Sequence, residues 1–403
     1  MLFGQFMNFI LLLIGWSILA IIAKLLKLDR RGIVIYPLIF IVKSDWFKRV
    51  IQREANRRGG FWEKYATVSS RIFIIVIIIA VLYFITNLYF LARSELVVPA
   101  GIPVGTALVP IIPFLTVNGK LLLYLIIGSA IAIIPHELAH GVVAVKKGIG
   151  IESAGFFLIF GAVLGGFVEI PEQFYADILK EKEESTVKKN NIELIRGFKK
   201  VVSAGILINI VFFAMLYGVA LNYPYLMSPF FKSDGVKIIY VESNSPAYNS
   251  GLVEGMIIRE INGTIIRDID DFLEALGNAS PGDTLIIRTD NGSLMIKLGR
   301  NPQDENKPYL GITITNYYRS NIPFIPDEMY EEFFYFIYIT MLLQFIIILL
   351  NALPIFVSDG AKFLFFFLRE RIRNRVYADK LYLFVNWLCL IIILLNFIFP
   401  LIS

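Results

Sequence analysis

Cysteine and histidine are nearly absent from this sequence of 403 residues. The single cysteine, Cys389, excludes a disulfide framework and a thiolate metal cluster. The two histidines, His136 and His140, lie four residues apart in the apolar stretch 132–144 (AIIPHELAHGVVA). Charged residues make up only 18% of the chain and hydrophobic residues 57%, which lies outside the range of soluble domains. The composition therefore predicts a polytopic membrane protein. Because no basic patch with interleaved aromatic residues is present, no nucleic-acid partner is expected.

Six apolar runs have the length of about 20 residues that a helix needs to cross a bilayer. They are residues 3–26, 72–92, 121–145, 199–221, 331–350 and 380–402. No cleavage site of small residues follows the first run, so a span is expected there and not a signal peptide. Two further apolar stretches do not suit a span. Residues 32–42 have the length of an interfacial or re-entrant segment, and the glycine-rich stretch 155–171 indicates a hairpin that dips into the membrane.

The distribution of basic residues predicts the orientation of these spans. Residues 24–71 contain 12 Lys and Arg against 4 Asp and Glu, and 369–380 are also basic, so both are expected in the cytoplasm. Residues 234–327 contain 8 basic against 13 acidic residues and are expected outside. Six spans with the N-terminus outside satisfy all three assignments.

The external segment has the pattern of a small domain inserted between the spans. Within 235–299, short β-rich runs alternate with Asn-Gly and Pro-Gly turn signals, and one helix is expected near 269–277. Three Asn-x-Ser/Thr sequons, at Asn262, Asn278 and Asn291, either mark an external location or arise by chance from turn sequences. The expected organisation is an N-terminal transmembrane region with a basic loop, a membrane core in two parts, and an extracytoplasmic domain. The boundaries are 1–120 for the N-terminal region, 121–221 and 328–403 for the two parts of the core, and 233–316 for the inserted domain.

The two histidines have the spacing of zinc ligands. On a helix, His136 and His140 project from the same face one turn apart, and Glu137 beside them can reach a water at an open metal position. Ionisable groups inside a membrane span are costly and mark functional sites. The alternative is that both imidazoles are satisfied by hydrogen bonds between helices.

A catalytic zinc of this kind needs a third protein ligand, and no histidine remains. Asp359 is the candidate, because it follows a long apolar run that Pro354 and Gly360 interrupt, which predicts a broken helix at membrane depth. His136 lies ten residues before Lys146, and Asp359 lies ten residues before Arg369. If both segments are helical, each ligand is about 15 Å from the cytoplasmic face, and the two depths agree.

Together these motifs resemble the site-2 proteases, the zinc metalloproteases that cut substrates within the membrane. The resemblance covers about 120–400 and includes His-Glu-Leu-Ala-His at 136–140, SAGILIN at 203–209, and N-x-x-P-x-x-x-x-D-G beginning at Asn351. GGFVEIPEQ (165–173) is similar to the membrane hairpin of an archaeal-type subgroup, and 233–316 resembles an inserted PDZ domain. Ile206 replaces a proline of the family pattern, which leaves the shape of that span open.

The resemblance and the residues together imply an intramembrane zinc metalloendopeptidase with one Zn²⁺ per chain. His136, His140 and Asp359 would hold the metal, and Glu137 would act as general base and then general acid. Asn351 is a candidate substrate or oxyanion contact, with a helix-packing amide as the alternative. Pro135 is expected to kink its helix and leave a carbonyl free. Glu169 is either structural or substrate-facing.

The expected partners are single-span membrane proteins and the lipid bilayer, with the active site in the cytoplasmic half of a cell membrane. Two other functions compete with proteolysis. One is a catalytically inactive adaptor that recruits peptides through its PDZ domain, against which the presence of both Glu137 and Asp359 argues. The other is a metal transporter, which would carry further ionisable residues along a path through several spans. The sequence does not indicate the substrate or the oligomeric state.

Overall fold

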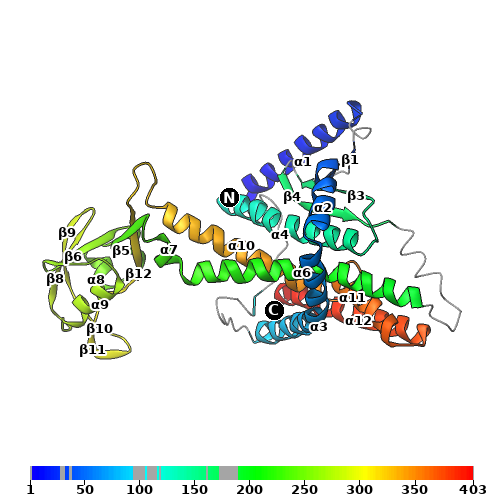
Figure 1. Cartoon of the computed structure of the whole chain (residues 1–403). Helices are drawn as coiled ribbons and strands as arrows, with labels where there is room; N and C mark the ends of the chain where they lie inside the picture. The colour runs from blue at the N-terminus through cyan, green and yellow to red at the C-terminus, as the bar shows by residue number, and fades with distance from the viewer. Residues whose placement is uncertain are drawn as a thin grey trace. The chain divides into compact units, whose positions relative to one another are not determined.

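A computed structural model of the chain describes residues 2–27, 32–35, 39–93, 105–106, 116–117, 119–159, 162–171 and 189–402. The chain forms two compact units. Unit 1 consists of residues 1–218 and 336–403, and unit 2 consists of residues 219–335. Figure 1 labels the elements of both units. Unit 1 contains the two histidines and Asp359, and unit 2 contains the segment expected to form an inserted domain.

Among the described residues, five helices are long and apolar enough to cross a membrane. They are α3 (Gly59–Ala92), α4 (Gly119–Lys146), α6 (Lys189–Leu221), α10 (Met329–Ala352) and α12 (Arg375–Ile402). At the first of the six expected spans, α1 (Leu2–Leu25) contributes a shorter apolar stretch, Ile10–Leu25. Helices suit this environment because they satisfy their own backbone hydrogen bonds without water. The prediction of a polytopic helical membrane protein is confirmed.

Aromatic side chains fill the core between the helices of unit 1. The ring of Phe73 on α3 lies 4.6 Å from that of Phe363 on α11 (Asp359–Arg371), measured between centroids. Phe198 on α6 stacks on Phe366, also on α11, at 5.1 Å. All four rings are fully buried. The short helix α11 is therefore fixed between two long helices, which holds its first residue, Asp359, in place.

The predicted break between α10 and α11 is present. Ser358 precedes α11 as its N-cap: its hydroxyl accepts a hydrogen bond from the N–H of Ala361 and donates one to the carbonyl of Leu353 at 2.6 Å. Gly360 packs so closely on the end of α10 that a Cβ there would lie 2.0 Å from the carbonyl oxygen of Ala352. The Asp-Gly pair thus needs glycine for close packing, and the serine satisfies backbone groups that the break leaves free.

Unit 1 also contains a four-stranded antiparallel sheet in the order β1-β2-β3-β4. Its strands are β1 (Ile33–Ile35), β2 (Ile39–Lys43), β3 (Ser153–Ile159) and β4 (Ala162–Glu169). The hairpin expected at 155–171 corresponds to β3 and β4, and residues 160–161 lie outside the described part of the chain. The stretch expected to be interfacial or re-entrant supplies β1 and β2 of the same sheet. Sequence reasoning missed this pairing of segments more than 100 residues apart.

Glycines allow this sheet to pack closely against its neighbours. A Cβ at Gly155 would lie 2.0 Å from the carbonyl oxygen of Val42 on β2, and a Cβ at Gly165 would lie 2.5 Å from the side chain of Ile133 on α4. The glycines therefore bring β4 against α4, the helix that carries the histidines. Figure 1 shows both strands of the hairpin in the region of α4.

The basic segment after α1 contains an amphipathic helix, α2 (Asp45–Arg57). Ser44 caps its start by accepting a hydrogen bond from the N–H of Phe47, and Phe47, Ile51 and Ala55 form its buried face. Ile51 contacts Gly141 of α4, where an added Cβ would lie 3.0 Å away. The apolar face of α2 thus packs within unit 1.

Unit 2 is a small α+β domain with its own apolar core, as predicted. Its larger sheet has the order β12-β5-β6-β8-β9, all pairs antiparallel, with β7 paired to β6, and β10 and β11 form a separate hairpin. The strands are β5 (Phe231–Val241), β6 (Ile257–Ile261), β7 (Thr264–Ile265), β8 (Thr284–Thr289), β9 (Gly292–Lys297), β10 (Gly299–Asn301), β11 (Asp304–Tyr309) and β12 (Ile312–Ser320). Three short helices accompany them: α7 (Tyr223–Met227), α8 (Pro246–Asn249) and α9 (Ile269–Gly277).

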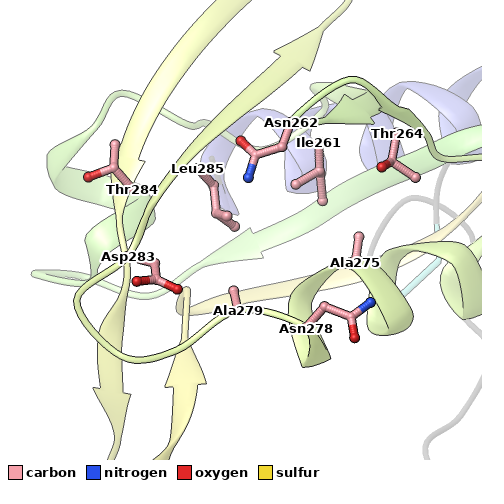
Figure 2. Close-up of a pocket in the computed structure, with 9 residues that line it drawn as sticks. All are labelled: Ile261, Asn262, Thr264, Ala275, Asn278, Ala279, Asp283, Thr284 and Leu285. Carbon is pink, nitrogen blue, oxygen red and sulfur yellow. The ribbon is translucent and has the colours of Figure 1, made fainter.

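Two of the three sequon asparagines lie at one polar depression of about 370 Å³ in this domain. Figure 2 shows Asn262 and Asn278 among the residues that line it. Asn262 has a left-handed backbone (φ 49°), and with Gly263 it forms the turn between β6 and β7. Its carboxamide oxygen accepts a hydrogen bond from the N–H of Ile286. The Asn262 sequon therefore coincides with a structural Asn-Gly turn, as the chance interpretation requires.

Where β12 leads into α10, unit 2 is tied together by aromatic and polar contacts. The rings of Tyr318 and Tyr330 stack with centroids 3.7 Å apart, and the Tyr223 hydroxyl donates a hydrogen bond to the carbonyl of Tyr330 at 2.6 Å. The carboxylate of Asp327 accepts hydrogen bonds from the Tyr317 hydroxyl and from the N–H of Ser320. These contacts hold the turn after β12 against the start of α10.

Candidate active site at a histidine and aspartate cluster

The two histidines lie on one buried face of α4, as their spacing predicts. His136 is 3% exposed and His140 is 8% exposed. Their Nε2 atoms are 3.0 Å apart. Both rings form a cluster with Asp359, the first residue of α11. A four-residue separation along a helix accounts for this geometry, because it places both side chains one turn apart on the same side.

Asp359 completes the cluster from α11. Its Oδ2 atom lies 3.1 Å from His136 Nε2 and 3.0 Å from His140 Nε2. As the first residue of α11, Asp359 follows directly from the helix break, which turns its carboxylate towards α4. Residues more than 200 positions apart in the sequence are therefore brought together, as the comparison of their depths predicts.

The spacing of these three atoms fits a tetrahedral metal. Ligands about 2.0–2.1 Å from a tetrahedral zinc are roughly 3.3 Å from one another, and the three edges here measure 3.0–3.1 Å. Two imidazole nitrogens and a carboxylate oxygen all face the same point. Two histidines with one carboxylate are a common catalytic zinc set.

His140 is oriented by a backbone carbonyl on α6. Its Nδ1 lies 2.7 Å from the carbonyl oxygen of Val201, to which the ring donates, and this leaves the Nε2 lone pair directed at the cluster. His136 Nδ1 is buried and has no hydrogen-bond partner among the described residues. Hydrogen bonding thus selects the tautomer of His140 that a metal ligand needs.

Gly205 on α6 brings the helix backbone directly against the cluster. A Cβ at this position would lie 2.4 Å from His136 Nε2 and 2.5 Å from His140 Nε2. That Cβ would occupy the volume which a metal shared by both nitrogens requires. The glycine of the SAGILIN segment therefore keeps the metal position open.

A cavity of about 110 Å³ adjoins the cluster. It is lined by Glu137, His140, Val168, Ile170, Val201, Val202, Asp359 and Lys362. Glu137 lies on the side of α4 that faces β4, where an added Cβ at Gly166 would be 3.6 Å from the Cβ of Glu137. The proposed base thus borders the same small cavity as two of the proposed metal ligands.

Asn351, Pro135 and Glu169 lie outside this set of cavity-lining residues. Asn351 is partly buried in the last turn of α10, and its proposed substrate contact stays a prediction. Pro135 lies inside α4, and because proline has no N–H, it gives the carbonyl of Ile131 no helical hydrogen bond. Glu169 accepts hydrogen bonds from Ser153 and Lys43, which lower its pKa in that order of effect. These contacts favour a structural role for Glu169.

Sequence reasoning missed three contributors to the site. Val201 acts through its backbone carbonyl, which leaves no side-chain signal in the sequence. Gly205 belongs to a recognised segment, but its contact with the histidines needed the packing of α6 on α4. Lys362, a cation one turn after Asp359 and directly before an apolar run, carried a signal that could have been noticed.

Comparisons with known proteins found a relative by sequence and several solved structures. Over 237 residues the chain is 31% identical to Uncharacterized protein MJ0971 of Methanocaldococcus jannaschii, which covers 58% of this chain and 54% of that protein. The chain thus matches about half the length of this curated relative. The PDZ domain of an SdrC-like protein of Listeria monocytogenes is 29% identical, covering 20% of this chain and 87% of that one, with a TM-score of 0.19. The PDZ domain of the corresponding Listeria innocua protein is 26% identical, covering 20% and 93%, with a TM-score of 0.18.

The family comparison covers the region that contains the whole cluster. Residues 124–395 match Peptidase family M50. This range includes the two histidines, Glu137 and Asp359, and it spans well over half of the 403 residues. The chain belongs to peptidase family M50, the site-2 proteases.

Proposed function

We propose that this protein is an intramembrane zinc protease that hydrolyses a peptide bond in or near the membrane span of its substrates. The observation that carries the proposal is the triangle formed by His136 Nε2, His140 Nε2 and Asp359 Oδ2, with edges of 3.0–3.1 Å. These three side chains would hold a zinc as the three protein ligands that catalytic zinc sites have.

Glu137 is the proposed general base. When bound, zinc supplies Lewis-acid chemistry that polarises a carbonyl and lowers the pKa of water. Glu137 borders the same cavity without belonging to the ligand triangle, so its carboxylate is available to accept a proton from water. It then passes that proton to the nitrogen of the leaving amine.

An extended substrate segment is expected to bind along β4. This strand is at one edge of its sheet, so the backbone groups on its outer side have no partner strand among the described residues. Val168 on β4 and Ile170 just after it line the cavity beside Glu137. A substrate helix hides its peptide bonds, and pairing with an edge strand would hold an unwound segment extended next to the base.

Asn351 is proposed to contact the substrate, because it lies in the last turn of α10 before the break that presents Asp359. The alternative, a helix-packing amide, predicts that its replacement changes stability and leaves the kinetics of the folded enzyme unchanged.

The proposed setting is a cell membrane, with the metal in the cytoplasmic half of the bilayer and the inserted PDZ-like domain outside. The basic stretches 24–71 and 369–380 support this orientation by the positive-inside rule. The expected substrates are single-span membrane proteins. One zinc per chain is expected, because the described residues offer one group of three such ligands, His136, His140 and Asp359.

The test is proteolysis by purified protein in lipid vesicles that also contain a single-span substrate. Cleavage should occur with zinc, stop with a chelator, and return when zinc is restored. Glu137→Gln should abolish cleavage and keep about one zinc per chain, whereas Asp359→Ala should lose both. A protein that binds zinc and substrate peptides but cleaves nothing would instead be an adaptor, and zinc movement across the vesicle membrane would indicate a transporter.

A further inference from the structure

We propose that Lys362 is a catalytic residue whose ammonium group binds the oxygen of the scissile carbonyl and then the new carboxylate of the product. This inference rests on the proposed peptidase function and deepens it. It adds a residue to the reaction that neither the histidine motif nor the aspartate motif contains.

Lys362 is placed at the reacting centre by the pitch of α11. It lies three residues after Asp359, so both side chains project from the same face of the helix. Lys362 Nζ is 3.9 Å from Asp359 Oδ1, whereas Oδ2 of the same carboxylate faces the two histidines. The aspartate therefore stands between the metal position and the ammonium group.

Lys362 is also the cation of the cavity. The other ionisable side chains that line it are Glu137, His140 and Asp359. With neutral histidines, the two carboxylates and a bound dication sum to zero charge. Attack of water on a carbonyl adds negative charge to its oxygen, and among the described lining residues Lys362 alone carries a positive charge to offset it.

Hydrogen-bond donors are scarce at this cavity. Four of its lining side chains are the apolar Val168, Ile170, Val201 and Val202. Both carboxylates are acceptors when ionised, and the Nδ1–H of His140 is used by the Val201 carbonyl. Among the described side chains that line the cavity, Lys362 therefore supplies the N–H donors that remain available for a substrate.

The contact with Asp359 does not fully occupy this lysine. A distance of 3.9 Å exceeds that of a hydrogen bond, and the side chain of Lys362 is 46% exposed. An ammonium group on a four-carbon stem can therefore reach an oxygen in the cavity without breaking a tight ion pair.

The reaction balances without any additional reactant. The water oxygen bonds to the carbonyl carbon, the carbon–nitrogen bond breaks, and the amine leaves with a proton that Glu137 transfers. The carbonyl oxygen becomes one oxygen of a carboxylate. Lys362 gains and loses no proton in this sequence, because it acts only by its charge and its N–H groups.

Two readouts test the proposal in zinc-loaded protein in vesicles. The first is the kinetics of Lys362→Gln and Lys362→Arg. We expect Lys362→Gln to lower kcat about 100-fold with little change in KM, and Lys362→Arg to recover part of the loss. Arg371→Gln is the control, because it removes an exposed cation from the same helix at a position that does not line the cavity.

The second readout is binding, measured in the inactive Glu137→Gln background with a product peptide that ends either in a carboxylate or in an amide. Adding Lys362→Gln should weaken binding of the carboxylate form about tenfold and leave the amide form unchanged. Metal analysis and thermal unfolding of every variant accompany both readouts, and Lys362→Met is the alternative if Lys362→Gln does not fold.

The outcomes are distinct. Unchanged kcat and unchanged carboxylate binding in Lys362→Gln, while wild type cleaves, would refute the role of Lys362 alone. Loss of zinc from Lys362→Gln would also refute it, because the lysine would then serve to position Asp359. Failure of wild-type protein to cleave with zinc present would instead refute the peptidase function itself.

Discussion

The backbone of Gly205 lies against the imidazole of His136, so that a Cβ on residue 205 would stand 2.4 Å from Nε2. Neither of the other two glycines of α6, Gly197 and Gly218, meets the histidine rings in this way. The relationship explains why a long apolar helix carries a glycine next to the proposed metal ligands, despite the lower helix propensity of glycine.

Gly205→Ala should lose zinc while the protein stays folded. The added methyl group would overlap the space between the two Nε2 atoms. We therefore expect the affinity for zinc to fall about 100-fold or more. Loss of a hydrogen-bond partner of a metal ligand already has an effect of this order. Metal analysis after dialysis against a weak chelator measures this. Gly218→Ala on the same helix, where nothing lies within 4 Å of the new Cβ, is the control and should keep its zinc. Equal zinc retention by both variants would contradict the overlap.

Gly360→Ala should damage the fold as well as the site. Its Cβ would lie 2.0 Å from the carbonyl oxygen of Ala352, so the break between α10 and α11 would have to open. We expect a loss of about 2–5 kcal/mol in unfolding free energy, as for other strongly destabilising core changes, together with displacement of Asp359. Thermal unfolding and zinc content measure the two effects. Gly60→Ala, which meets no atom within 4 Å, should leave both unchanged.

The grouping of His136, His140 and Asp359 could be predicted from the sequence because it depends on local spacing and on two short motifs. Helix pitch alone places His136 and His140 on one face, and the break at Asp359 follows from a proline and a glycine in an apolar run. Counting residues from the basic borders then predicts that the ligands share one depth. Neither helix pitch nor residue spacing depends on how the helices pack.

What the sequence could not predict depends on tertiary packing. The strand pairing of Ile39–Lys43 with β3 joins segments more than 100 residues apart, and an apolar stretch of eleven residues does not reveal its partner strand. Val201 contributes a backbone carbonyl, which any residue could provide. Only the packing of α6 against α4 identifies it as the partner of His140.

The turn after β12 should loosen in acid. Burial raises the pKa of Asp327, but hydrogen bonds from the Tyr317 hydroxyl and the Ser320 N–H outweigh this and hold the pKa below its usual value. The stabilisation is therefore complete above about pH 4, the usual range of an aspartate, and is lost as the pH falls through the lower folded-state pKa. Hydrogen exchange, corrected for the intrinsic rate, should show lower protection of Ser320 at pH 3 than at pH 5.

The variant Asp327→Asn provides the comparison. It removes the charge, so protection of Ser320 should already be reduced at pH 5 and should change little on acidification. If wild type and variant lost protection in parallel between pH 5 and pH 3, another group would control this turn.

The inserted domain is expected to act as a filter on substrates and not as part of the chemistry. Ser233 and Tyr318 are directly paired across β5 and β12, so a short Gly-Ser turn can replace residues 234–317 without separating the chain ends. The shortened protein should keep its zinc. Compared with the full chain, it should cleave substrates with long external segments at a rate closer to that for short ones. Rates for two substrates that differ only in external length measure this selectivity. Loss of cleavage of the short substrate by folded, zinc-loaded protein would contradict the filter.

The position of the cut should follow from the depth of the metal. His136 lies ten residues before Lys146 at the end of α4, and Asp359 lies ten residues before Arg369 on α11. At 1.5 Å per helical residue, both ligands are about 15 Å from the basic border. Hydrolysis requires the scissile carbonyl to approach the metal ligands, so the depth of the site sets the depth of the cut.

A single-span substrate should therefore be cut within the cytoplasmic half of its span, about ten helical residues from the border. Residues that leave a helix readily, such as glycine, proline, asparagine and β-branched residues, should be frequent near the cut, because the segment must unwind to lie along β4. The cytoplasmic fragment would keep an apolar stub of about ten residues, too short to hold it in the bilayer. Mass spectrometry of the released fragments measures the site directly. Termini in the external half of the span would overturn both the proposed orientation and the depth argument. Termini in the cytoplasmic half would mean that the depth of His136, His140 and Asp359 determines the release of a soluble product.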